Sequence, residues 1–587
     1  MSSRTFGPKL TRDGTSFRLW APAAQRVDLL LGPVQHPMQR CDGGWYVVDI
    51  EGARAGARYK FRIDGKLDIP DPASSFQPED VFGPSEVIDH DAFDWRARDW
   101  RGRPWEETAL IETHVGAFTR EGSFRAMIDK LDHLVDIGMT ALELMPLADF
   151  FGRRGWGYDG VLWYAPDDSY GRPEDLKTLI DEAHLRGLMV FLDVVYNHFG
   201  PEGNFLHRYA PDFFTEAHTP WGSAIDYRLG EVRAFAIENA LSWLADYRFD
   251  GLRFDAVNHI VTTPGEMSML HDLSIAAGQL AAETGRHVHL VLENGDNLAS
   301  LLDATENPPR GKFRAQWNDD YHHAFHVLLT RESGGYYRDF QRRPLRDIAR
   351  SLSSGFVYQG DFAAFWNRRR GEPSGALTPA AFVNFLQNHD QIGNRPLGER
   401  LESLVDARPI EAALAITLLA PAIPMLFMGE EWGAQTPFLF FCDFTGGLAD
   451  AVRRGRRREY GWAYATHGDD VPDPLDVQTF EASKLDWDGR ERESGKRRLA
   501  LVRDLLSVRR WQLVPRLSGA GFGEAHVGDD CVLSASWRMG DGTTLGLLAN
   551  LSPATVAHDV PQAKGAPIWG GEPGTTLPPW SVYWRLG

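Results

Sequence analysis

Four short apolar segments, each ending in charged or amide residues, constrain the fold more than any other feature of this chain. They read MVFLDVVYNHFG (189–200), FDGLRFDAVNHI (249–260), VHLVLENGDN (288–297) and FVNFLQNHDQIGN (382–394). Near-continuous runs of Val, Ile, Leu and Phe are typical of strands that are buried on both faces. A parallel barrel has its active site at the C-terminal ends of such strands. The segments therefore predict one polar cluster that contains Asp193, Asp255, Glu293 and Asp390.

The chain from about residue 110 to 430 has the pattern of the rest of such a barrel. Strand-like and helix-like segments alternate along it. The predicted strands are 109–118, 141–147, 189–198, 249–257, 287–294, 313–319, 382–390 and 423–431. Eight strands with helical connections predict a (β/α)₈ TIM barrel, which is an α/β fold. The four polar segments then belong to its third, fourth, fifth and seventh strands.

Two all-β regions flank the predicted barrel. Residues 1–95 contain short segments rich in β-formers, separated by Gly, Pro and Asp, as in a carbohydrate-binding-like β-sandwich. Strand-like segments return near the end of the chain. We therefore expect an N-terminal β-sandwich over 1–95, a catalytic barrel with loop insertions over 96–520, and a C-terminal β domain over 521–587.

The composition argues against several classes of protein. A net charge of -19 and a pI of about 5.5 argue against nucleic acid or an anionic membrane as a partner. Cys41, Cys442 and Cys531 have no metal-binding spacing, and so few cysteines suit a reducing compartment. The N-terminus lacks the apolar region of a signal peptide. Prolines interrupt the apolar run 412–428, which predicts a buried helix followed by a strand. We expect a cytoplasmic protein.

The carboxylates at the strand ends indicate a class of reaction. Cleavage of a glycosidic bond needs one carboxylic acid to protonate the leaving oxygen. It needs a second carboxylate to attack carbon or to activate water. Arg253 lies two residues before Asp255, so both side chains point to the same face of a strand, and the guanidinium keeps Asp255 ionised. An ionised carboxylate suits a nucleophile. The spacing alone therefore indicates a glycosidase-like cluster.

The same segments resemble the signature regions of the α-amylase superfamily of glycoside hydrolases. DVVYNH (193–198), GLRFDAVNH (251–259), LENGDN (292–297) and FLQNHD (385–390) match the first to fourth signatures in family order. The resemblance implies that Asp255 is the nucleophile, Glu293 the general acid/base and Asp390 the carboxylate that stabilises the transition state. It also implies sugar contacts from Tyr158, His198, Arg253, His259 and His389.

A finer resemblance covers the whole chain. DVVYNHFGPEGN (193–204), QNHDQIGNRPLGERL (387–401) and FEASKLDW (480–487) are similar to maltooligosyltrehalose trehalohydrolases. This resemblance implies a retaining hydrolase that cuts the α-1,4 bond beside a terminal trehalosyl unit and releases trehalose and a maltooligosaccharide. The segment after Asp390 would line the leaving-group subsites, with substrate contacts from Asn394 and Arg395.

Two other functions stay open at this stage. A glycogen branching or debranching enzyme has the same sandwich-and-barrel layout. A non-catalytic glucan-binding protein is the third possibility, although it would not need an acid/base Glu. We expect no metal or other cofactor, because the acidic residues are committed to catalysis and no ligand loop for a hard cation is visible. The expected partner is an α-glucan bound by a monomer, with no nucleic acid and no membrane.

Several other residues have two interpretations each. Trp221 and Trp317 are candidate platforms for stacking on sugar rings, although most Trp residues are core. His114 stands at a strand end and is open to either a pocket-lining or a structural role, whereas His133 is expected to be structural. The basic run 453–458 is expected to be a solvated surface.

Overall fold

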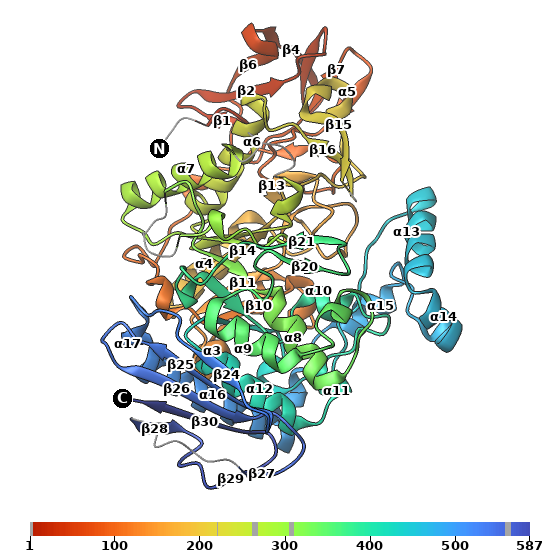
Figure 1. Cartoon of the computed structure of the whole chain (residues 1–587). Helices are drawn as coiled ribbons and strands as arrows, with labels where there is room; N and C mark the ends of the chain where they lie inside the picture. Colours follow the sequence, from red (N-terminus) through yellow and green to blue (C-terminus); the bar gives the residue numbers. More distant parts are fainter. Residues whose placement is uncertain (1–3, 220, 261–267, 304–309, 558–564) are drawn as a thin grey trace.

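The computed structural model describes residues 4–219, 221–260, 268–303, 310–557 and 565–587. Three regions follow one another along the long dimension of the molecule in Figure 1. The N-terminal strands lie at one end, the barrel occupies the middle, and the C-terminal sheet lies at the other end. The predicted order of the three regions is confirmed.

The N-terminal region consists of two antiparallel sheets. One sheet has the order β1 (Lys9–Leu10), β2 (Gly14–Trp20), β6 (Trp45–Glu51) and β5 (Gln39–Arg40). The other contains β4 (Val34–Pro37), β3 (Val27–Leu31), β7 (Arg58–Ile63) and β8 (Leu67–Ile69), and β9 (Ser85–Glu86) pairs with β7. Along β7 the residues Tyr59, Phe61 and Ile63 are buried, and those between them are more exposed. This period of two lets each sheet bury one face.

The central region is a closed barrel of eight parallel strands. Their order is β10 (Leu110–Thr113), β11 (Ala141–Leu144), β14 (Met189–Val194), β17 (Gly251–Phe254), β18 (His289–Leu292), β19 (Ala315–Trp317), β22 (Phe382–Asn384) and β23 (Ile423–Phe427). All eight predicted strands are present, and the polar segments follow the third, fourth, fifth and seventh. Each strand is shorter than predicted, because residues at its ends lie outside the ladder, in the loops and short helices that flank it.

Helices surround the barrel and carry its connections. The longer ones are α4 (Pro173–Leu185), α6 (Gly230–Ala245), α7 (Ser268–Thr284), α8 (Asp319–Thr330), α9 (Pro344–Ser354), α12 (Ala407–Leu419) and α16 (Glu493–Val508). The apolar run 412–428 divides into α12 and β23, as expected. Among the described residues, no helix combines the length and the apolar character that a membrane span requires.

The C-terminal sheet has the order β24 (Ala525–Val527), β25 (Val532–Arg538), β26 (Thr544–Asn550), β30 (Ser581–Leu586) and β28 (Ala566–Trp569). Two buried indoles attach it to the barrel. Trp537 Nε1 donates to the carbonyl of Leu352 on α9, at 2.9 Å. Trp584 Nε1 donates to the carbonyl of Ala415 on α12, at 3.1 Å. The sheet is therefore packed on the barrel helices.

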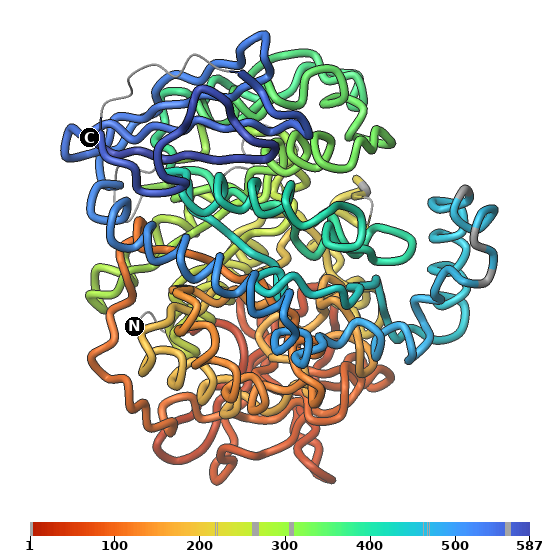
Figure 2. Tube along the Cα trace, turned by 90° about the horizontal axis from the view of Figure 1, so that it is seen from below, coloured from red at the N-terminus to blue at the C-terminus, as the bar shows by residue number. Residues whose placement is uncertain are grey.

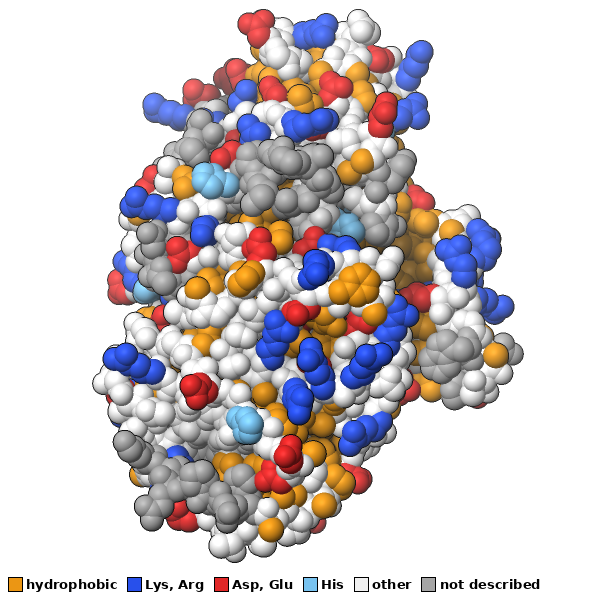
Figure 3. Space-filling view, viewed as in Figure 1, with side chains coloured by type: hydrophobic (Ala, Val, Ile, Leu, Met, Phe, Trp, Pro, Cys, Tyr) orange, Lys and Arg blue, Asp and Glu red, His pale blue; other side chains and the backbone are white. Residues whose placement is uncertain are grey.

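Two helices, α13 (Gly446–Glu459) and α14 (Gly461–His467), form a projection that we call the arm. It stands off from the body in two perpendicular views (Figures 1 and 2). Arginine side chains gather on its outer side (Figure 3). Arg453, Arg454, Arg457 and Arg458 are exposed, as expected for the basic run, but Arg456 is only partly exposed.

Candidate active site

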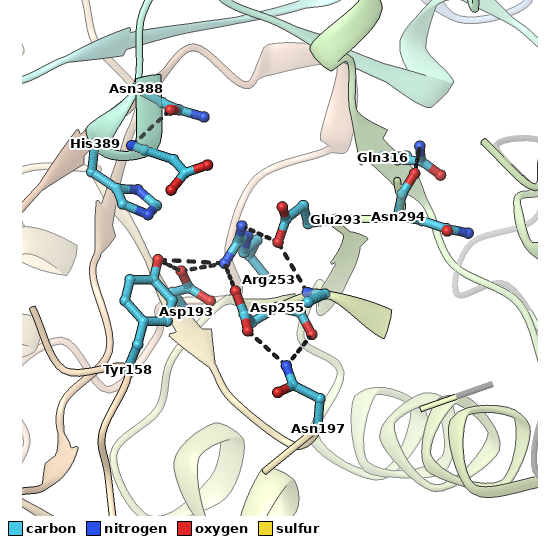
Figure 4. A network of polar contacts seen from close by, with 12 residues as sticks. Tyr158, Asp193, Asn197, Arg253, Asp255, Glu293, Asn294, Gln316, Asn388 and His389 are labelled. Carbon is cyan, nitrogen blue, oxygen red and sulfur yellow. Dashed lines mark hydrogen bonds and ion pairs between the residues drawn. The ribbon is translucent and has the colours of Figure 1, made fainter. Parts of the chain in front are cut away.

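The predicted carboxylates converge at the C-terminal face of the barrel. Asp193 lies within β14, whereas Asp255 directly follows β17 and Glu293 directly follows β18. Asp390 follows β22 and lies in the short helix α10 (His389–Gly393). Parallel strands bring these ends to one edge of the barrel, so residues far apart in the sequence form one network (Figure 4).

Arg253 is the centre of this network. Its side chain is 2% exposed. Nη1 donates to Asp193 Oδ2 at 2.6 Å and to Asp255 Oδ1 at 3.1 Å. Nη2 donates to Glu293 Oε2 at 2.6 Å (Figure 4). One buried guanidinium therefore joins three carboxylates, and charge-assisted bonds of this kind fix geometry strongly.

The ring of Trp317 supports this guanidinium. The Cζ of Arg253 lies 4.2 Å from the ring centroid. Trp317 is 1% exposed, so the idea that it is a sugar platform is wrong. The ring faces the interior because it follows the alternation of the sixth strand, and it contributes a cation–π contact to Arg253.

A strained turn follows β17 and contacts Glu293 at the end of β18. Ala256 has φ 42° and ψ 48°, in the left-handed region that residues with a Cβ rarely adopt. In this conformation its amide donates to Glu293 Oε2 at 2.9 Å. On the other side, Asn197 Nδ2 donates to Asp255 Oδ2 at 2.7 Å. Each of the two carboxylates thus has a donor besides Arg253.

The environment changes the proton affinity of the carboxyl groups. Burial raises the pKa of Glu293, the charge of Asp255 raises it further, and Arg253 opposes both. Burial raises the pKa of Asp193 to about 7. The pKa of Asp390 is also raised, with burial as the main cause. A raised pKa lets a carboxyl group near neutral pH act as a proton donor, which suits Glu293.

The side chains of His389 and Tyr158 contact each other. Their rings stack at 5.1 Å between centroids, and the Tyr158 hydroxyl donates to Asp193 Oδ2 at 2.5 Å. His389 Nδ1 is bonded to Glu112 on β10. Burial alone would lower the pKa of His389, but the Glu112 carboxylate raises it above its usual value. The sequence prediction missed Glu112, although it is a carboxylate within an apolar strand.

The two other predicted histidines lie beside Trp221. His198 Nε2 is bonded to the carbonyl of Tyr158 at 2.9 Å, and burial lowers its pKa to about 4. Trp221 is 48% exposed, stacks on the His198 ring and meets the His259 ring edge-on. An exposed indole above these histidines is compatible with sugar stacking, and its use as a platform stays a prediction.

The segment after Asp390 is held by polar contacts of its own. Asn394 Nδ2 donates to Asp390 Oδ1 at 2.6 Å. Arg395 forms a bidentate pair with Glu332, at 2.7 and 3.0 Å, and a further pair with Glu399 at 3.3 Å. The N–H groups of Arg395 thus already donate to carboxylates. A substrate contact from Arg395 would have to share these N–H groups.

A further carboxyl group that the sequence prediction missed is Asp319. It is the first residue of α8 and closely follows the sixth strand, β19. Burial raises its pKa to about 8, and the charges of Glu293 and Asp390 add to that rise. The segment WNDD (317–320) has the pattern of the other strand ends, an apolar run followed by amide and acid, and could have indicated it.

His114 and His133 are both held by contacts within the protein. His114 is buried, its Nδ1 accepts from the amide of Ala117 at the start of α1 (Val115–Phe118), and its Nε2 is bonded to Gly155 O at 2.8 Å. His133 Nε2 is 3.2 Å from Glu431 Oε1. In the part of the chain that the structure describes, no group of three or more His, Cys, Asp or Glu residues could hold a metal ion.

Family models match part of each of the three regions. Residues 97–221 match the family model of the alpha amylase catalytic domain. Residues 5–76 match carbohydrate-binding module 48, the isoamylase N-terminal domain. Residues 520–584 match a domain of unknown function, DUF3459. These matches agree with a glycoside hydrolase that has a β module at each end.

Curated relatives decide the family. Malto-oligosyltrehalose trehalohydrolase from Deinococcus radiodurans is 45% identical, over 85% of this chain and 81% of its own. The enzyme of the same name from Saccharolobus solfataricus is 41% identical, over 82% and 84%. The chain belongs to the malto-oligosyltrehalose trehalohydrolase family. As a member of it, the chain is a glycoside hydrolase. A 1,4-alpha-glucan branching enzyme from Corynebacterium jeikeium is a more distant relative of this chain, at 31% identity.

Solved structures agree with the fold. A crystal structure from Salmonella typhimurium, described as an alpha amylase, superposes on this trehalohydrolase family member with a TM-score of 0.93. The two chains are 43% identical and cover each other completely. A pullulanase from Paenibacillus barengoltzii has the same fold, with a TM-score of 0.72 at 18% identity.

Proposed function

We propose that this enzyme hydrolyses the α-1,4-glucosidic bond beside the terminal trehalosyl unit of maltooligosyltrehalose, releasing trehalose and a maltooligosaccharide. The names of the relatives that match most of the chain support this substrate. The observation that carries the type of reaction is the Arg253 guanidinium, which is bonded to both Asp255 and Glu293. One cation holds the two carboxyl groups close together, as a retaining glycosidase requires.

In the first step, Asp255 acts as the nucleophile and Glu293 as the acid. A carboxylate oxygen of Asp255 attacks the anomeric carbon, while protonated Glu293 transfers its proton to the glycosidic oxygen. The C–O bond breaks, and trehalose leaves with that proton. The glucan remains as an ester of Asp255. Arg253 donates a hydrogen bond to Asp255 Oδ1 and so holds the nucleophile in place, and the raised pKa of Glu293 keeps its proton available.

In the second step, Glu293 acts as the base. Its carboxylate takes a proton from water, and the water oxygen attacks the anomeric carbon. The ester bond breaks, so Asp255 returns to its ionised form and the maltooligosaccharide leaves with retained configuration. We assign to Asp390 the stabilisation of the positive charge that develops on the sugar ring in both transition states. Tyr158, His198, His259 and His389 would contact the sugar in the cleavage subsite.

Specificity for the trehalosyl unit is assigned to the segment after Asp390. Asn394 and Arg395 follow the seventh strand, on the face where barrel enzymes bind substrate. A site that forms buried hydrogen bonds with its substrate rejects an analogue that lacks the bonded groups by large factors. A plain maltooligosaccharide should therefore be cut slowly.

Two substrates test the proposal. Maltotriosyltrehalose and maltopentaose have five glucose units each but differ in the terminal linkage. We expect kcat/KM to be at least tenfold higher for maltotriosyltrehalose, with trehalose and maltotriose as products. Asp255→Asn, measured in parallel, corrects for contaminating amylase. Equal values would indicate a general amylase, and new α-1,6 linkages in the products would indicate a branching enzyme.

Three further proposals concern the domain boundaries, the oligomeric state and the cellular compartment. We propose domains at 1–95, 96–520 and 521–587, supported by the gap between β9 and β10 and by the gap between α17 (Val514–Leu517) and β24. Since one chain supplies all the proposed site residues, we propose a monomer. Three free cysteines support a cytoplasmic setting.

Catalysis by carboxylates alone predicts full activity in excess EDTA. A loss of activity in EDTA that calcium restores would contradict this prediction.

A further inference from the structure

One arginine of the basic run on the arm turns toward the barrel. The Arg456 side chain is 13% exposed, whereas that of Arg453 is 45% exposed. Its Cζ lies 4.0 Å from the ring centroid of Phe440 and 5.4 Å from that of Tyr460. A guanidinium that packs against two aromatic rings has lost much of its rotational freedom. Arg456 is therefore not part of the solvated surface that the basic run predicts.

Polar contacts connect Arg456 with Asp390. Arg456 Nη1 donates to the Tyr460 hydroxyl at 2.9 Å and to Asn394 Oδ1 at 3.2 Å. The Tyr460 hydroxyl donates to the backbone carbonyl of Asn394. Asn394 Nδ2 then donates to Asp390 Oδ1 at 2.6 Å. The arm thus reaches the proposed transition-state carboxylate through one intermediate side chain.

The direction of each bond follows from the chemistry of the groups. A guanidinium has donors only, so the amide of Asn394 must turn its oxygen toward Arg456. Its NH₂ group then faces Asp390, which as a carboxylate needs a donor. The Tyr460 hydroxyl accepts a hydrogen bond from Arg456 and donates one to the carbonyl of Asn394, so it acts as both acceptor and donor. With Arg456 absent, the amide could rotate and present its oxygen to Asp390.

We infer that Arg456 and Tyr460 are positioning residues for Asp390, acting through Asn394. The inference rests on the proposed role of Asp390 in the reaction. By fixing the orientation of the Asn394 amide, the arm holds one carboxylate oxygen of Asp390 in place. A small displacement of a catalytic group can cost about 100-fold in rate. The arm is then a working part of the active site.

The test compares Arg456→Met with Arg454→Met. Both variants remove a guanidinium from α13, but Arg454 is exposed. We expect Arg456→Met to lower kcat about 10- to 100-fold with KM changed less than about threefold. Arg454→Met should keep wild-type kinetics. Arg456→Lys should recover part of the loss, because an ammonium can still donate to Asn394 Oδ1 but cannot replace the planar fork.

Two further measurements separate positioning from a general loss of structure. Because Asp390 serves both chemical steps, Arg456→Met should slow an activated aryl glycoside as much as the natural substrate. The double variant Arg456→Met/Asn394→Ala should be no slower than the worse single variant, since both act on one path. Near-wild-type kcat in Arg456→Met, or losses that multiply in the double variant, would overturn the inference.

The proposed function has a separate control. Asp390→Asn should abolish turnover if Asp390 has the assigned role. An active Asp390→Asn would overturn the proposed role itself, whereas an inactive Asp390→Asn with an unaffected Arg456→Met would overturn only the inference about the arm. Equal urea midpoints of wild type and Arg456→Met confirm that the fold is intact.

Discussion

At the scale of single residues, Arg253 connects the two carboxyl groups that we propose as nucleophile and acid, Asp255 and Glu293. It is bonded to Asp255 and Glu293, and yet burial still raises the pKa of Glu293. The same cation therefore serves two carboxyl groups whose environments differ, and a difference of this kind separates an acid from a nucleophile. The sequence motif RFD predicted the pairing of Arg253 with Asp255, because residues two apart in a strand share a face.

The role of Glu293 predicts a difference between leaving groups. Glu293→Gln cannot donate a proton, so turnover of maltotriosyltrehalose should fall at least 1000-fold, in line with removal of a general acid. An aryl glycoside with a good leaving group needs no proton, and its release of phenol in the first turnover should stay near the wild-type rate. Rapid-quench measurement of phenol release checks this. Equal losses on both substrates would assign the acid to another residue.

The partly buried carboxyl of Asp319 predicts a dependence of stability on pH. Its pKa is about 8 in the folded protein against an ordinary value of 3.8. A raised pKa means that the folded state favours the protonated form, so this stability is present below about pH 4 and is lost as the pH rises to about 8. Asp319→Asn should therefore gain unfolding free energy relative to wild type between pH 5 and pH 8.

Urea unfolding at several pH values measures this difference. Asp450→Asn, a change at an exposed position on the arm, is the matched control. If the difference between Asp319→Asn and wild type is the same at pH 5 and pH 8, the carboxyl is ionised throughout and the assigned pKa is wrong.

At the scale of elements, the connection between α12 and β23 depends on one buried side chain. Arg509, which follows α16, donates through Nη1 to the carbonyls of Leu418 and Ala420, at 3.2 and 2.7 Å. Nη2 donates to the carbonyl of Ala422 at 2.7 Å. Arg509→Met would leave these buried acceptors unpaired and should lower the free energy of unfolding by about 3 kcal/mol.

The exposed neighbour Arg510 provides the control. Arg510→Met should change the free energy of unfolding by less than about 0.5 kcal/mol, and both variants should keep wild-type kcat at 25 °C. Chemical denaturation with the same baseline fits measures both. A loss below 1 kcal/mol in Arg509→Met would mean that water replaces the guanidinium at the three carbonyls.

The elements also show where sequence reasoning succeeds. The barrel strands were predictable because burial on both faces requires continuous apolar residues, as in MVFLDV of β14. The inward turn of Arg456 was not predictable, because its partner Asn394 is 62 positions away in the chain. Nothing in the local pattern of a basic run distinguishes the one arginine that finds such a partner from those that face water.

At the scale of the whole molecule, the order of sandwich, barrel and C-terminal sheet follows the order of the sequence patterns. The parts join through side chains of different kinds. The N-terminal segment meets α6 through the amides of Thr5 and Phe6, which donate to Glu238. The C-terminal sheet meets α9 and α12 through Trp537 and Trp584. Tertiary contacts of this kind could not be derived from local periodicity.

The position of the arm predicts how proteolysis would inactivate the enzyme. The arm stands away from the body (Figure 2) and carries exposed arginines, so trypsin should cleave the native protein there first. A nick beside Arg456 would release the contact with Asn394, while the barrel and both β modules keep their own cores. Limited digestion should then yield a nicked enzyme that melts at the temperature of the intact one but has lost most of its turnover. A nicked protein with full activity would show that the arm can be cut without cost to catalysis.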